Sequence, residues 1–174
     1  MNVVLARWHA LPRDEAAREI LSCCGSRAWA ARLAAMRPFV DEPSLFAAAD
    51  RCWLDLPEAD WLEAFRSHPR IGEKHAQTKT TAASAAWSSA EQSQMKAADA
   101  AILLRMQQGH REYEERFGRI FIVCASGKQP AEMLQILEQR LGNDPAEELL
   151  ESAAQQQQIM QLRLRKWLAG PGVA

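Results

Sequence analysis

The spacing of apolar residues predicts a long helix in the second half of the chain. From Ala90 onward, apolar positions recur at steps of three and four residues, which places them on one face of a helix. The positions that share this face are Met95, Ala98, Ile102, Met106, Gly109, Tyr113 and Phe117. Gly118 follows and ends the pattern, so we expect one buried helix face that stops there.

Capping residues and prolines predict five further helices along the chain. Asp14 caps the first, which ends at Met36 because a residue that precedes proline avoids helical geometry. Ser44 caps the second. The expected ranges are 15–36, 44–54, 57–67, 130–141 and 145–168. The Gln155–Gln158 run falls inside the last helix, where we interpret it as a solvated face.

Two stretches lack the helical pattern. Residues 68–88 contain Pro69, Gly72 and a polar run, and they predict a loop of about 20 residues, a length that is often functional inside a compact domain. Residues 120–125 are the most extended-looking run, and one short run cannot make a sheet. We therefore expect a buried extended segment within a single domain over residues 1–174, frayed from about residue 170.

Composition agrees with an all-α fold. The chain has 31 alanines but only 15 valines, isoleucines and threonines together. Alanine propagates helices, whereas β-branched residues favour strands. The predicted fold is therefore an all-α, single-domain helical bundle with one long loop and one short extended segment.

The charge balance argues against several classes of partner. There are 21 basic and 22 acidic residues, for a net charge of −1, so we expect no nucleic acid and no membrane as partner. The chain has no apolar run of the roughly 20 residues that span a membrane. Its first residues lack the continuous apolar region of a signal peptide, so we expect none. Four cysteines without Cys-x-x-Cys spacing, and four histidines without helical ligand spacing, predict reduced thiols and no metal. We expect a cytoplasmic protein.

The first candidate for chemistry is His68, which directly follows a predicted helix and precedes Pro69. A histidine on a loop that a rigid helix positions is well placed for proton transfer at neutral pH. The alternative is that His68 caps the C-terminus of the helix before it, where a cation is favourable.

The second candidate is the segment of Ser88, Glu91 and Gln92 at the start of the long helix. Free backbone amides at a helix N-terminus can hold an anionic or carbonyl-rich ligand, and Glu91 could orient that ligand or His68. The alternative is a capping box in which Ser88 and Glu91 bond each other's backbone amides.

The third candidate is Arg163, which follows Ile159 and Met160 and precedes Trp167 on one face of the last helix. A guanidinium on an apolar face needs an anionic partner, because burying it unpaired is expensive. The alternatives are a snorkelling side chain or a surface salt bridge.

Taken together, these clusters resemble the OHCU decarboxylases, where OHCU is 2-oxo-4-hydroxy-4-carboxy-5-ureidoimidazoline. Members of that family act in uric acid (purine) breakdown without a cofactor, and their product is (S)-allantoin. The resemblance runs from about residue 28 to residue 168. Its motifs are Arg37-Pro38-Phe39, His68-Pro69 with Gly72 and Lys74, Ser88 with Glu91-Gln92, Tyr113 with Phe117-Gly118 and Phe121, Arg140-Leu141 with Asn143, and Ile159 with Arg163-Leu164.

The resemblance implies a set of roles. His68 would be the general acid–base group near the departing carboxylate, and Glu91 would be a second catalytic residue that orients the substrate. The long loop would then be the catalytic loop. Substrate-binding residues would be Pro69, Ser88, Gln92, the main chain of Phe121, Ile122, Val123, Cys124 and Ala125, and Arg163. The family also implies an all-helical fold, no cofactor, a small anionic ureidoimidazoline substrate and a homodimer.

Two residues depart from the family pattern. Arg70 stands where an acidic residue often follows His-Pro, and Arg119 stands within a stretch that is usually apolar. Two other interpretations stay open. One is a metal-dependent hydrolase, and the other is a non-enzymatic helical protein-interaction module. The module would present part of the tryptophan set on its surface, namely Trp8, Trp29, Trp53, Trp61, Trp87 and Trp167.

Overall fold

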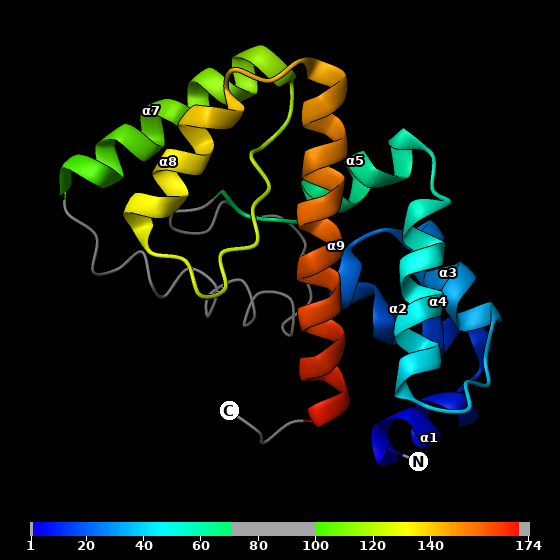
Figure 1. The fold of residues 1–174 in the computed structure, drawn as a ribbon. Helices are drawn as coiled ribbons and strands as arrows, with labels where there is room; N and C mark the ends of the chain where they lie inside the picture. The colour runs from blue at the N-terminus through cyan, green and yellow to red at the C-terminus, as the bar shows by residue number, and fades with distance from the viewer. Residues whose placement is uncertain (1, 71–99, 171–174) are drawn as a thin grey trace. The chain divides into compact units, whose positions relative to one another are not determined.

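The computed structural model describes residues 2–70 and 100–170, and these residues form eight helices and no β-strand (Figure 1). The all-α prediction is confirmed. The helices are α1 (Val3–Ala10), α2 (Arg13–Cys24), α3 (Arg27–Ala35), α4 (Glu42–Leu54), α5 (Glu58–Arg66), α7 (Ala100–Phe117), α8 (Pro130–Arg140) and α9 (Pro145–Ala169). None of these helices is long and apolar enough to cross a membrane.

The chain divides into two compact units. Unit 1 comprises residues 1–64 and 157–174, and unit 2 comprises residues 65–156. Helix α9 contributes its first half to unit 2 and its second half to unit 1. A single domain over the whole chain stays a prediction, and residues 171–174 of the expected tail lie outside the described residues.

Three tryptophans form the centre of unit 1. Trp8, Trp29 and Trp53 are fully buried. A buried indole needs an acceptor for its N–H, and Nε1 of Trp8 donates to the Ala16 carbonyl at 2.9 Å, while Nε1 of Trp29 donates to the Ala49 carbonyl at 3.0 Å. These three side chains therefore belong to the core and not to the surface that a protein-interaction module would present.

The predicted helix over residues 15–36 is wrong, because two helices occupy that range. Gly25 lies at φ 87°, in the left-handed region, and ends α2. Ser26 then caps α3 by accepting a hydrogen bond from the Trp29 amide at 3.2 Å. Asp14 is not a cap, since α2 begins at Arg13. The preceding helix α1, which the apolar pattern did not predict, is capped by Asn2.

The second predicted helix begins earlier than expected. Asp41, not Ser44, is the N-cap of α4, and the two residues form a reciprocal capping box in which the Asp41 carboxylate accepts from the Ser44 amide at 2.8 Å. Helices α5, α8 and α9 lie within one or two residues of their predicted bounds. Prolines and glycines at the ends of these helices made their bounds predictable from the sequence.

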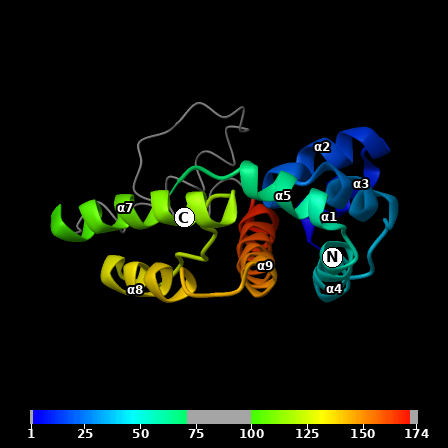
Figure 2. The same cartoon turned by 90° about the horizontal axis from the view of Figure 1, so that it is seen from above.

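Unit 2 is built on the packing of α7 against α8, which run side by side in both views (Figures 1 and 2). The predicted apolar face is confirmed where α7 is described: Met106, Gly109 and Tyr113 are buried against Met133 and Leu137 of α8. A Cβ atom on Gly109 would lie 2.8 Å from Cδ2 of Leu137, so the Leu137 side chain would have to shift to admit a larger residue there. Residues 90–99, where the helix was predicted to begin, lie outside the described residues.

The glutamine run on α9 is not a solvated face. Gln156 is fully buried, and only Gln158 of the four is exposed. Oε1 of Gln155 accepts a hydrogen bond from the Cys124 amide at 2.9 Å, and Nε2 of Gln157 donates to Asp50 at 2.8 Å. The solvated-face interpretation is therefore wrong, because amide side chains here satisfy polar groups inside the fold.

Candidate active site

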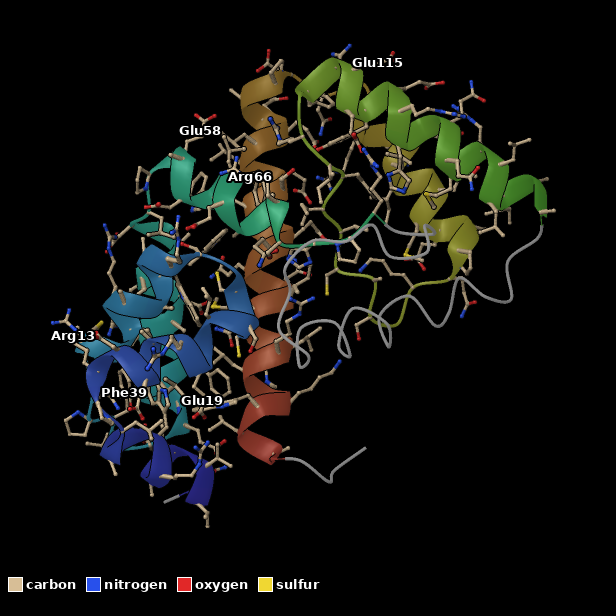
Figure 3. All side chains as sticks on the ribbon, turned by 180° about the vertical axis from the view of Figure 1, so that it is seen from behind. Arg13, Glu19, Phe39, Glu58, Arg66 and Glu115 are labelled. Atoms are coloured by element: carbon tan, nitrogen blue, oxygen red, sulfur yellow. The ribbon has the colours of Figure 1, made fainter. Side chains whose placement is uncertain are left out.

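His68 and Pro69 lie where the chain leaves α5. The helix ends at Arg66, which Figure 3 labels, and the His68 amide donates to the carbonyl of the buried Phe65 at 3.1 Å. His68 and Pro69 are both partly exposed. The structure thus places the predicted catalytic histidine in a turn whose backbone is hydrogen-bonded to the buried end of α5, and the residue itself is partly exposed.

The next residue, Arg70, ties this segment to α7. Its Nε donates to Oε1 of Glu114, and its Nη2 donates to Oε2 of Glu114 at 2.6 Å, so the guanidinium and the carboxylate meet as a two-pronged pair. Hydrogen bonding from Arg70 holds the pKa of Glu114 below its ordinary value, against the opposing effect of burial. Glu114 follows the core residue Tyr113 on α7 and precedes Glu115, which Figure 3 labels. Sequence reasoning had singled out Arg70 only as a departure from the family pattern.

The segment of residues 121–125 is buried along its whole length and has no regular secondary structure. Three side chains form hydrogen bonds with its main chain. Nη1 of Arg140 donates to the Ile122 carbonyl at 2.7 Å, Nζ of Lys128 donates to the Cys124 carbonyl at 2.8 Å, and Gln155 accepts from the Cys124 amide. A ligand that approached the Cys124 amide would therefore compete with Gln155.

A buried ionic network supports this segment. Arg140 and Glu148 are paired with side-chain exposures of 7% and 0%, and Tyr113 donates its hydroxyl proton to the Glu148 carboxylate. Burial acts to raise the pKa of Glu148, but hydrogen bonds from Arg140 and Tyr113 outweigh it, and the pKa lies below its ordinary value. Burial, and then the contact with Glu148, raise the pKa of Tyr113 to about 12. The network holds an ionised glutamate and a neutral phenol.

Arg163 lies in unit 1, on the part of α9 that packs into its core. The side chain is 1% exposed, and Ile159 and Met160 beside it are also buried. The alternatives of a snorkelling side chain and a surface salt bridge are therefore wrong. Burial raises the pKa of the neighbouring Cys23 thiol, and the positive charge of Arg163 acts in the opposite direction. All four cysteines are buried free thiols.

Three of the predicted site residues, Ser88, Glu91 and Gln92, lie outside the described residues. Among residues 2–70 and 100–170, no three histidine, cysteine or acidic side chains lie close enough together to hold a metal ion.

Sequence reasoning gave no supporting role to the residues that hold the two described segments of unit 2. Arg140 was named only within a family motif, Gln155 was interpreted as part of a solvated face, and nothing local marks Glu114. The one available signal was the pair of His110 and Glu114, which are four residues apart and so share a face of α7. His110 is 3% exposed, and its ring centroid lies 5.8 Å from that of Phe121. This face of α7 thus contacts both candidate substrate segments.

Unit 1 contains a cavity of about 420 Å³ between α2, α3 and α4. It is lined by Arg13, Ala31, Arg32, Ala35, Met36, Arg51, Cys52 and Asp55. None of the predicted site residues contributes to it, so it does not enter the candidate active site.

Comparison with known proteins places these residues in a family. The family model of OHCU decarboxylase matches residues 9–165. A "uric acid degradation bifunctional protein TTL" of Arabidopsis thaliana is 33% identical over 144 residues, which are 83% of this chain and 44% of that protein. A "2-oxo-4-hydroxy-4-carboxy-5-ureidoimidazoline decarboxylase" of Amia calva is 33% identical over 137 residues, 78% of this chain and 77% of that protein. The chain thus spans less than half of the first relative and most of the second.

Solved structures agree with the sequence comparison. A crystal structure of OHCU decarboxylase in the presence of (S)-allantoin superposes with a TM-score of 0.74 at 32% identity, covering 87% of this chain and 97% of that one. A crystal structure of (S)-allantoin synthase superposes with a TM-score of 0.67 at 18% identity, covering 94% of this chain and 53% of that one, and it supports the fold alone. Because the family model matches 157 of the 174 residues, counting from 9 to 165, the chain belongs to the OHCU decarboxylase family.

Proposed function

We propose that this protein is a carboxy-lyase that decarboxylates OHCU to (S)-allantoin in uric acid degradation, without a cofactor. The observation that carries the proposal is the likeness to a decarboxylase crystallised with (S)-allantoin, which this chain matches over nearly its whole length. The placement of His68 and Pro69 in a partly exposed turn of unit 2 supports it independently.

The chemistry needs little beyond orientation and a proton. The bond between the ring carbon and its carboxylate breaks, CO₂ leaves, and the electron pair moves into the conjugated C=N group of the imidazoline. One proton must then reach a ring carbon from a single face to give the (S) product. The protein therefore has to align the carboxylate with the π-system, stabilise developing charge and deliver that proton.

We assign these tasks to the residues singled out above. His68 is the general acid–base group, because an imidazole can both hold and release a proton near neutral pH. Glu91 accepts hydrogen bonds from the substrate and orients it, and Ser88 and Gln92 hold its polar atoms. The remaining substrate-binding assignments are Pro69, the main chain of residues 121–125, and Arg163, whose charge would balance that of the anionic substrate.

A homodimer in the cytoplasm completes the proposal. The four buried free thiols are in keeping with a reducing compartment. Sedimentation analysis tests the dimer, and a monomer at working concentration would contradict it.

The decisive experiment generates OHCU from urate in the presence of the protein and follows circular dichroism. We expect optically active (S)-allantoin to form faster than the uncatalysed racemic product. His68→Ala should lower kcat by roughly 10²–10⁴-fold, the usual contribution of a general acid–base group. The matched control is Arg66→Ala, which removes an exposed side chain two residues away and should leave kcat unchanged.

Two results would overturn the proposal. Racemic allantoin formed at the uncatalysed rate would show that the chain is not this enzyme, and a fully active His68→Ala variant would show that His68 is not the proton-transfer group. The same assay with a chelator tests the metal-dependent alternative, which requires activity to fall.

A further inference from the structure

The segment that carries His68 is attached to α7 through the side chain of Arg70. Residues 69 and 70 follow the end of α5 and have no regular secondary structure. Arg70, two residues after His68, reaches across 44 positions in sequence to Glu114 on α7.

The partner on α7 sits on a rigid support. Tyr113, next to Glu114, is fully buried, and Met106 and Gly109 of the same helix are packed against α8. The Glu114 carboxylate is therefore attached to the core of unit 2, and the ion pair fixes Arg70, two residues after His68, relative to that core.

The geometry of the Arg70–Glu114 pair is suited to orienting the His68 segment more than to stabilising the folded protein. A planar guanidinium that donates two parallel hydrogen bonds to a carboxylate fixes direction as well as distance. The side chains of Arg70 and Glu114 are 40% and 26% exposed, so water screens their attraction and the contribution to stability is small. A change in this pair should thus alter where the segment lies more than whether the protein folds.

We propose that the Arg70–Glu114 pair is a positioning device that holds the His68–Pro69 segment in its working place against α7. Arg70 and Glu114 are positioning residues and not catalytic ones, because they act through His68. The consequence for catalysis rests on the proposed function, whereas the structural attachment does not.

The test compares single variants with a charge swap. Arg70→Ala, and separately Glu114→Gln, which keeps the size of the side chain, should lower kcat by roughly ten- to a hundredfold, the effect expected of a small misplacement. KM should change less than kcat. The double variant Arg70→Glu with Glu114→Arg restores the pair in reverse and should recover much of the lost kcat.

The swap also separates positioning from a direct role of the Arg70 charge. If Arg70 acted on the substrate itself, Glu114→Gln would leave kcat unchanged and the swapped protein would stay as impaired as Arg70→Ala. Either of these results would overturn the proposal.

A second ion pair of unit 2 provides the matched control. Nε of Arg105 donates to Oε1 of Glu138 at 2.8 Å, and the two side chains are 37% and 43% exposed. This pair joins α7 to α8 and does not include the His68 segment. Glu138→Gln should therefore leave kcat unchanged, and an equal loss in this variant would mean that any ion pair on α7 has the same effect.

A readout without substrate keeps the inference distinct from the proposed function. The NMR signals of the His68 imidazole should shift in Arg70→Ala and Glu114→Gln, and stay in place in Glu138→Gln. If the wild-type protein forms no (S)-allantoin but these shifts occur, the proposed function fails and the positioning device stands. If the shifts do not occur, the positioning device is refuted whatever the activity.

Discussion

Two arginine–glutamate pairs hold the two described segments of unit 2 that are candidates for substrate binding, and the pairs differ in burial. Arg70 and Glu114, which hold the His68 segment, are 40% and 26% exposed, while Arg140 and Glu148, which support residues 121–125, are 7% and 0% exposed. The same chemistry has different consequences in the two places. A buried pair is costly to break because the remaining charge has no water around it, whereas a partly exposed pair is cheap to break and contributes mainly direction.

The largest expected effect comes from breaking the buried pair. Arg140→Ala leaves the Glu148 carboxylate in the core and removes the donor to the Ile122 carbonyl, so we expect a loss of about 3–5 kcal/mol in the free energy of unfolding. Chemical denaturation measures it. The double variant Arg140→Met with Glu148→Leu should lose less than Arg140→Ala, because no charge is left unpaired. A loss below about 1 kcal/mol in Arg140→Ala would mean that burial does not distinguish the two pairs.

The next effect depends on pH and concerns Tyr113. Its pKa is raised from 10 to about 12, so its contribution to stability is complete below pH 10 and is lost as the pH rises toward 12. We expect the stability difference between the wild type and Tyr113→Phe to shrink by on the order of 2 kcal/mol across this window. Urea denaturation at the two ends of the window measures this difference. A constant difference would mean that the phenol is not held neutral by the network.

The smallest effect on stability is expected at the exposed pair. Glu114→Gln should lower the free energy of unfolding by less than about 1 kcal/mol at neutral pH. Because the pKa of Glu114 lies below its ordinary value of 4.5, the contribution is present above 4.5 and disappears as the pH falls through the lowered value. Thermal unfolding of both proteins over this acidic range checks the sign. If Glu114→Gln lowered the free energy of unfolding as much as Arg140→Ala does, the exposed pair would contribute to stability as the buried pair does, and the two pairs would not differ.

The helices of this fold could be predicted where a proline or a glycine marks a helix end. Prolines 57, 130 and 145 and Gly118 mark helix ends, and those bounds were predicted within one or two residues. The prediction failed at Gly25 and Ser26, although glycine before serine is a usual junction between two helices. An alanine-rich apolar pattern on both sides concealed the break.

The candidate site was predictable only where the residues adjacent in sequence indicate the role of a side chain. His68 could be singled out from its position after a helix end, and the burial of residues 121–125 from their apolar run. The partners that position them could not, because Glu114 lies 44 residues from Arg70, and Gln155 lies 31 residues from Cys124. Such partners depend on tertiary packing. For the same reason, the glutamine run was misread as solvated.

The distribution of aromatic residues gives each unit its own spectroscopic signal. Five of the six tryptophans, at positions 8, 29, 53, 61 and 167, belong to unit 1, and the single tyrosine of the chain, Tyr113, belongs to the core of unit 2. A Trp87→Phe variant would confine indole fluorescence to unit 1, while the ring-proton NMR signals of Tyr113 would report on unit 2. The melting of the two halves could then be recorded separately in one unlabelled sample, and a difference between the two curves would reveal whether they lose their structure together.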